Sequence, residues 1–135
     1  MTDLMQESYP LSPEGALITC YWRRRDSLQP TVQVRAIVDT GAQRTAVAGW
    51  VIARLEAAPA ARIEGDSILY PLRLVLPLDD GRGNFDISVL GADMEQLAFD
   101  CVIGRDMLSA LEFTYNGRRS MFVVAARRRN PRRGV

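Results

Sequence analysis

Short apolar segments separated by closely spaced turns constrain the fold of this chain more than any other feature. Residues Thr31 to Val38 alternate apolar and polar side chains, the period-two pattern of a strand with one buried face. Other strand-like runs cover residues 16–22, 72–76, 85–90, 100–104, 113–115 and 121–124. Short helices are expected near residues 50–55 and 105–111. We therefore predict an all-β fold, a closed barrel or sandwich with one or two short helices.

The length of 135 residues predicts one domain. We expect an irregular arm over residues 1–14, which contain two prolines, a folded domain over 15–126 and an arginine-rich flexible tail over 127–135. The first ten residues hold no apolar stretch, and no run approaches the roughly 18 apolar residues of a membrane helix. These features predict a cytoplasmic protein without membrane contact. The tail has no aromatic residues between its arginines, so we expect it to be solvated and not to bind nucleic acid.

The missing residue types restrict the chemistry of the chain. It contains no histidine and no lysine, so all 17 of its basic residues are arginine. Nucleophiles activated by histidine, the usual zinc sites, Schiff bases and the phosphate-loop lysine are all excluded. Its two cysteines, Cys20 and Cys101, are expected to be free thiols. Carboxylates, hydroxyls and arginines remain, and we expect no metal and no cofactor.

Two short motifs lie about sixty residues apart, each beside an expected strand. Asp39-Thr40-Gly41-Ala42 follows the apolar strand that ends at Val38. By itself this tripeptide is an ordinary turn, in which the aspartate caps backbone amides. About sixty residues later Val102-Ile103-Gly104 precedes the second expected helix. Together these elements resemble the retropepsin-like aspartic proteases, and the strand order between them extends the resemblance over about residues 16–124.

The resemblance implies a catalytic site and a dimer. In that family the aspartate, threonine and glycine of the loop are catalytic, which here are Asp39, Thr40 and Gly41. Two facing carboxylates that share one proton activate a water and protonate the scissile carbonyl. This chain has only one such tripeptide, so a two-fold homodimer is expected, with the Thr40 hydroxyl bonded across the axis. The substrate is a peptide or protein, and the expected substrate-binding residues are Ala42, Gln43, Ile63, Gly65 and Ile103.

The chain departs from the family pattern at one ion pair. Retroviral members usually carry an acidic residue after the alanine, which pairs with the arginine that follows the second glycine. Here these positions are Gln43 and Arg105, so we expect Arg105 to pair with Asp100 or Asp106 instead.

The flap is a second departure and leaves two functions open. The glycine-rich hairpin that covers the substrate in this family corresponds to residues 62–68, which are short and charged. A short flap excludes water poorly. The alternative to an aspartic endopeptidase is therefore a catalytically weak or inactive module that dimerises or binds peptide. In either case we expect the apolar strands Leu17 to Trp22 and Met121 to Val124 to form a second dimer contact, because unpaired apolar strand edges associate.

Overall fold

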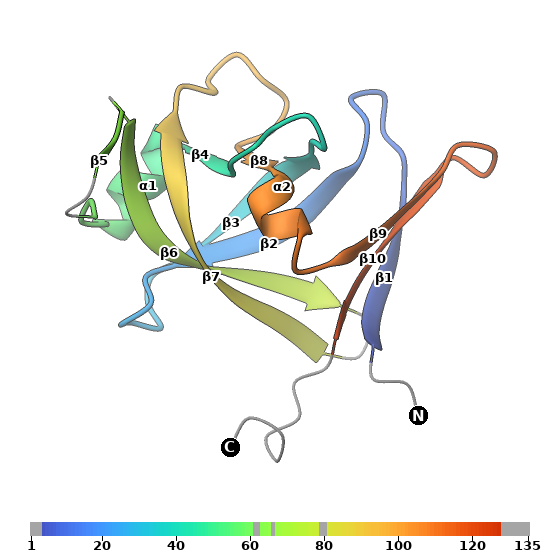
Figure 1. Cartoon of the computed structure of the whole chain (residues 1–135), viewed down its shortest axis with the longest axis horizontal. Coiled ribbons are helices and arrows are strands. Elements are labelled where there is room, and N and C mark those ends of the chain that lie inside the picture. The colour runs from blue at the N-terminus through green and yellow to red at the C-terminus, as the bar shows by residue number, and fades with distance from the viewer. Residues whose placement is uncertain (1–3, 61–62, 66, 79–80, 128–135) are drawn as a thin grey trace.

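The structure, a computed structural model of the chain, describes residues 4–60, 63–65, 67–78 and 81–127 (Figure 1). Over these residues the elements follow in the order β1 (Leu4–Pro10), β2 (Leu17–Arg23), β3 (Thr31–Val38), β4 (Ala46–Ala48), α1 (Gly49–Leu55), β5 (Ile63–Glu64), β6 (Ser67–Leu78), β7 (Gly81–Ala92), β8 (Cys101–Ile103), α2 (Arg105–Leu108), β9 (Glu112–Asn116) and β10 (Met121–Arg127). The prediction of an all-β fold with short helices is confirmed. None of the helices over these residues is long and apolar enough to span a membrane.

Six strands close into a barrel. They follow the order β2-β3-β8-β4-β7-β6, and a further pairing of β2 with β6 closes the ring. The pairs β3–β8 and β4–β7 are parallel, whereas the other pairs are antiparallel. The short strand β5 extends this sheet beyond β6. The closed barrel of the prediction is thus present, and closure leaves β2, β3 and β8 with a partner on both sides.

The barrel interior is filled by every second residue of its strands. The even-numbered residues 18–22 of β2, 32–36 of β3 and 72–78 of β6 are buried, as the period-two pattern predicts, and among the odd-numbered residues of these strands only Leu17 and Val75 are buried as well. The largest fully buried side chains are Trp22, Phe122, Leu55, Leu72, Leu74, Leu76, Ile103 and Met107. Burial of each such side chain contributes about 1.5–3 kcal/mol, so this interior is the main source of stability.

The two cysteines lie in this core. Cys20 and Cys101 are free and fully buried, on β2 and β8. A hydrogen bond with Cys101 and burial both raise the pKa of the Cys20 thiol. This thiol is therefore held in its protonated form.

A second sheet stands beside the barrel, at the right of Figure 1, with the strand order β1-β10-β9. The prediction of an irregular arm over residues 1–14 is wrong for Leu4–Pro10, because these residues pair along the whole of β10. Arg127, expected in the tail, ends β10 opposite Leu4, and the rest of the predicted tail lies outside the described residues. The inner face of this sheet is aromatic: Tyr9 stacks on Phe122 with ring centroids 5.1 Å apart.

The sheet order corrects the expected dimer contacts. The strand β2 pairs with β3 and β6, and β10 lies between β1 and β9. Neither strand therefore has a free edge, and the free edges of the second sheet belong to β1 and β9. Sequence pattern identified both segments as strands, but the edges depend on which strands come together across the chain.

The two short helices follow β4 and β8, with α1 at the left of Figure 1 and α2 near its centre. The helix α1 packs Val51, Ile52 and Leu55 on the core and ends at Glu56, which adopts a left-handed conformation with φ of 51°. The helix α2 begins directly after β8 and forms a single turn, shorter than the expected 105–111. Successive hydrogen-bonded turns carry the chain from its end to Leu111. Thus α2 joins the barrel to the second sheet, as Figure 1 shows.

Candidate active-site loop

The Asp-Thr-Gly segment forms a tight turn between β3 and β4, near the top centre of Figure 1. The amide of Ala42 donates to the carbonyl of Asp39 over 3.2 Å. The amide of Gly41 donates to Oδ1 of the Asp39 side chain over 2.9 Å. The turn therefore orients the carboxyl group of Asp39, which is exposed to solvent.

The parallel strand β8 holds the start of the turn through backbone contacts. Val38 lies opposite Ile103 in the β3–β8 register, and the amide of Asp39 donates to the carbonyl of Ile103 over 2.9 Å. The side chain of Ile103 is only 1% exposed and packs in the core. Ile103 was expected to contact substrate, but in this chain it holds the loop through its backbone.

The first turn of α2 holds the loop from the side. The amide of Arg105 donates to the carbonyl of Ala42 over 2.8 Å, and that of Asp106 donates to Gln43 over 3.3 Å. The guanidinium of Arg105 donates to the carbonyl of Thr40 over 3.1 Å. The expected ion pair of Arg105 with Asp100 or Asp106 is thus replaced by a bond to the loop backbone, because Arg105 lies directly beside the turn.

A buried threonine completes this support. Thr45 is fully buried, and its hydroxyl donates to Oδ1 of Asp106 over 2.7 Å and accepts from the amide of Gly104 over 3.1 Å. The amide of Thr45 also donates to both carboxylate oxygens of Asp106, at 3.0 Å each. Sequence reasoning missed both roles, because a threonine after a loop and an aspartate in a helix give no signal of their mutual distance.

Gly104 is required by close packing of this junction. A Cβ atom at Gly104 would lie 2.7 Å from the carbonyl carbon and oxygen of Arg44 and 2.9 Å from the carbonyl oxygen of Ala42. Real Cβ contacts of this kind do not reach such distances, and the neighbours are backbone atoms that cannot rotate away. A glycine therefore lets β8 and α2 approach the loop closely enough for the hydrogen bonds above.

The predicted site residues form two separate groups. Asp39, Thr40, Gly41 and Gln43 are exposed on the loop, and Ala42 is half-buried. Ile63 and Gly65 belong to the β5–β6 hairpin, with Gly65 at its tip in a left-handed conformation with φ of 62°. Figure 1 places β5 at the far left of the barrel, away from the loop after β3. A single chain therefore does not bring the hairpin and the loop together.

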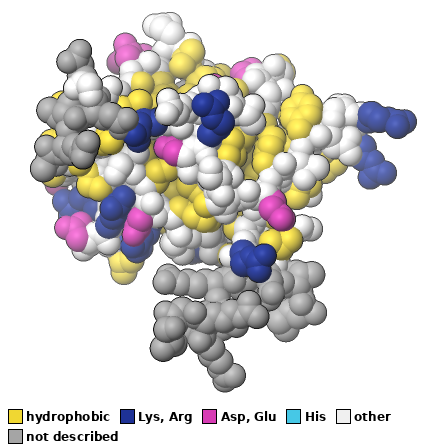
Figure 2. Space-filling model, in the orientation of Figure 1, with side chains coloured by type: hydrophobic (Ala, Val, Ile, Leu, Met, Phe, Trp, Pro, Cys, Tyr) yellow, Lys and Arg dark blue, Asp and Glu magenta, His cyan; other side chains and the backbone are white. Residues whose placement is uncertain are grey.

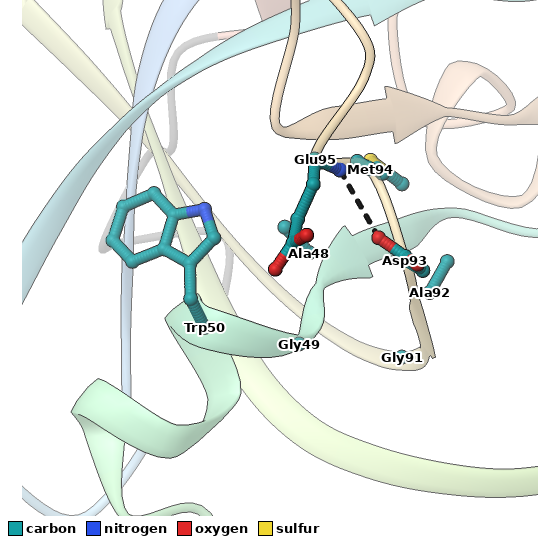
Figure 3. A pocket seen from close by; sticks show the side chains of 8 residues that line it. All are labelled: Ala48, Gly49, Trp50, Gly91, Ala92, Asp93, Met94 and Glu95. Carbon is teal, nitrogen blue, oxygen red and sulfur yellow. Dashed lines mark hydrogen bonds between the residues drawn. The ribbon is translucent and has the colours of Figure 1, made fainter.

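A hollow of about 390 Å³ lies at the other end of β4 (Figure 3). The side chains of Trp50 and Glu95 face each other across it, and the amide of Glu95 donates to Oδ1 of Asp93 over 3.1 Å. The hollow begins at Ala48, the last residue of β4, and none of the residues that line it belongs to the Asp39 loop. It therefore does not form part of the Asp39 turn.

The loop of one chain presents a single carboxylate to solvent. Asp39 is a single exposed carboxylate, and the side chains that hold its loop, Thr45, Arg105 and Asp106, are used in hydrogen bonds to backbone or to one another. Over the described residues no group of three or more histidine, cysteine or acidic side chains gathers to hold a metal ion. Searches of known protein families and of curated proteins find no match to this chain.

Proposed function

We propose that the chain is a retropepsin-like aspartic endopeptidase that acts as a homodimer. The observation that carries the proposal is the rigid, exposed turn of Asp39. Its carboxyl group is oriented by the Gly41 amide, and its backbone is held by both β8 and α2. Catalytic groups must be held within a fraction of an ångström by their support, and the bonds around this loop meet that need.

The chemistry follows from two such carboxylates that face each other. Like charges a few ångströms apart do not both ionise, so the pair retains one proton. The ionised Asp39 takes a proton from a water molecule, whose oxygen attacks the peptide carbonyl carbon. The protonated Asp39 of the second chain donates to the carbonyl oxygen. The first Asp39, which now carries the proton of the water, gives it to the amine nitrogen as the C–N bond breaks. The second Asp39 takes a proton from a hydroxyl of the intermediate, which forms the product carboxylic acid and restores the pair, so no covalent enzyme intermediate forms.

Two features support the homodimer. The hydroxyl of Thr40 is exposed, and among the described residues it has no hydrogen-bond partner, so it is available to a second copy of the loop. The free edge β9 carries Tyr115, whose side chain is 61% exposed. An edge with an exposed aromatic residue is a surface that readily pairs with another chain.

One observation favours the alternative function. The strand β5 has two residues, and its pairing with β6 covers only Ile63–Ile68 and Glu64–Ser67. So short a hairpin would cover a bound peptide poorly. A dimeric module that binds peptide and cleaves it slowly or not at all is therefore the second candidate.

Cleavage of a peptide library between pH 4 and 7 tests the proposal. Asp39→Asn should abolish cleavage with no change in folding, because the amide has the size of the carboxyl group. The matched control is Asp26→Asn, which removes an exposed carboxylate on the β2–β3 loop and should leave turnover unchanged. If wild-type protein binds peptides but cleaves none, the binding module is the correct function. Turnover retained in Asp39→Asn would exclude the carboxylate mechanism.

Sedimentation across a pH series tests the dimer separately. Two facing Asp39 carboxylates repel when both are ionised, so the dimer should dissociate more readily as pH rises past the loss of the shared proton. Asp39→Asn removes this repulsion and should make the association independent of pH in that range. A monomer at every pH, with peptide cleavage still measurable, would contradict both the dimer and the shared-proton mechanism.

A further inference from the structure

A second hollow, of about 590 Å³, lies on the outer face of the barrel and is unrelated to the Asp39 loop. Its floor is formed by Tyr21, Val75 and Asn84, which are neighbours because Tyr21 pairs with Val75 and Val75 with Asn84 in the strand register. The loop between β2 and β3 forms one rim, at the lower left of Figure 1, whereas the Asp39 loop lies near the top. The volume is in the range of small-ligand pockets, about 300–1,000 Å³.

Two arginines line this hollow without a carboxylate partner. Arg23 and Arg82 belong to its lining, and no ion pair between described residues includes either of them. One nitrogen of the Arg23 guanidinium donates to the carbonyls of Arg24 and Ser27, at 3.1 and 3.2 Å. These bonds fix the guanidinium on the loop and leave its donors on Nε and on the other terminal nitrogen for a ligand.

The neighbouring carboxylate is already shared by other arginines. Nε of Arg73 donates to Oδ1 of Asp86 over 2.6 Å, and Nη2 of Arg73 donates to Oδ2 of Asp86 over 3.0 Å. Nε of Arg25 lies 3.9 Å from Oδ1 of the same carboxylate. The pKa of Asp86 is lowered, mainly by the hydrogen bond from Arg73; burial opposes this effect, and the charges of Arg73, Arg25 and Arg23 add to it. The carboxylate of Asp86 is thus bound to Arg73 and lies near Arg25, and within the described part of the chain it forms no ion pair with Arg23 or Arg82. At the lower left of Figure 2, basic side chains lie together with acidic ones.

Apolar surface lies beside this positive charge. The side chain of Leu28 on the rim is 72% exposed, the largest exposed fraction among the large apolar side chains of the described residues. Pro77, which is half-buried, and Val75, which is only 9% exposed, continue this apolar lining from β6. A ligand that fills the hollow therefore meets guanidinium groups on its walls and apolar side chains on its floor and rim.

From this arrangement we propose that the hollow binds an acidic peptide segment, in which a carboxylate stands beside an apolar side chain. The carboxylate is held between Arg23 and Arg82, and the apolar side chain packs on Leu28 and Val75. Guanidinium groups bind carboxylates through paired, charge-assisted hydrogen bonds, which gives both affinity and orientation.

A peptide fits these observations better than a nucleic acid does. A nucleic acid carries a charge on every nucleotide and needs a basic surface that continues along its backbone. Here residues 1–126 carry 12 arginines against 16 acidic residues, so this part of the chain has a net negative charge that does not favour a polyanion. The apolar floor and rim are likewise suited to a hydrocarbon side chain.

Binding of labelled peptides, measured by fluorescence anisotropy, tests the proposal. The probe is a capped six-residue peptide with one glutamate between two leucines, and its partner has glutamine in place of the glutamate. A third peptide carries the glutamine and a free C-terminal carboxylate, which separates side-chain from terminal recognition. A single-stranded RNA of six nucleotides is the fourth probe. All are measured with wild-type protein and with Asp39→Asn, so that cleavage does not alter the result.

The glutamate peptide should bind at least about tenfold more tightly than its glutamine partner, a difference of 1.4 kcal/mol. Arg82→Gln and Arg23→Gln should each remove that preference. The matched control, Arg118→Gln, makes the same change of charge in the turn between β9 and β10 and should keep it. The proposal would be overturned if the two capped peptides bound equally well to the wild type. It would also be overturned if Arg118→Gln lost the preference for glutamate as Arg23→Gln and Arg82→Gln do, or if the RNA bound more tightly than the glutamate peptide. Peptide binding measured with Asp39→Asn tests this proposal whether or not the chain is a protease.

Discussion

The hydroxyl group of Thr45 should be a main support of the Asp39 loop, and Thr45→Val removes it with almost no change of shape. The hydroxyl donates to the carboxylate of Asp106 over 2.7 Å and accepts from the amide of Gly104 over 3.1 Å. Valine can do neither. The backbone amide of Thr45 still reaches Asp106, so the carboxylate keeps a partner.

The magnitude follows from the two lost bonds. A hydrogen bond to a charged group contributes about 1.5–3 kcal/mol, and a buried amide left without an acceptor costs about 1–3 kcal/mol. We expect Thr45→Val to lower the free energy of unfolding by about 3 kcal/mol, near the lower part of the summed range, because the junction can relax. With a urea dependence of about 1.5 kcal/mol per molar, the unfolding midpoint should fall by about 2 M.

Urea unfolding followed by tryptophan fluorescence measures this change, since Trp22 lies in the core. Thr45→Ser keeps the hydroxyl and removes one buried methyl group, so it should cost only about 1 kcal/mol. Thr114→Val changes an exposed threonine on β9 and should alter the free energy of unfolding by less than about 0.5 kcal/mol. A cost for Thr45→Val no larger than that for Thr45→Ser would refute the reasoning, because the hydroxyl would then contribute nothing.

Three further predictions concern other parts of the molecule. Gly104→Ala should destabilise the protein by more than about 2 kcal/mol in urea unfolding, because its Cβ atom would overlap the loop backbone; a variant as stable as the wild type would show that the close approach is unnecessary. The pKa of Asp86 is lower in the folded protein, so its pairing with Arg73 stabilises the fold above the unfolded pKa of about 4 and is lost as pH falls through the lower folded value. Asp86→Asn should therefore make the melting temperature fall less steeply as pH is lowered below about 4. An unchanged dependence of the melting temperature on pH would contradict the assignment. Cys20 and Cys101 should react with a thiol reagent at pH 8 only on unfolding, and rapid reaction of the folded protein would contradict their burial.

Local sequence pattern predicted the elements of the barrel well. The alternation of Thr31 to Val38 depends only on residues within one strand, and it correctly assigned the inner and outer faces of β3. The strand-like runs at residues 113–115 and 121–124 likewise predicted β9 and β10. The exposed placement of Asp39 follows from its position directly after a buried strand.

Tertiary structure decided what depends on contacts between distant residues. Leu4–Pro10 looked irregular because its residues do not alternate clearly, yet β10 supplies a complete partner from the other end of the chain. Barrel closure removed the free edge expected at β2, and the position of α2 turned Arg105 toward the Thr40 carbonyl instead of an acidic side chain.

The same distinction holds for the two candidate sites. The sequence by itself determined which residues could carry chemistry, since the absence of histidine and lysine left carboxylates and arginines. Only the tertiary structure decided that Asp106 and Thr45, 61 residues apart, hold the Asp39 loop together, and that Arg23 and Arg82 line one hollow. The physical reason is that side-chain type and periodicity are local properties, whereas hydrogen bonds and cavities form between strands whose register is set by packing of the whole core.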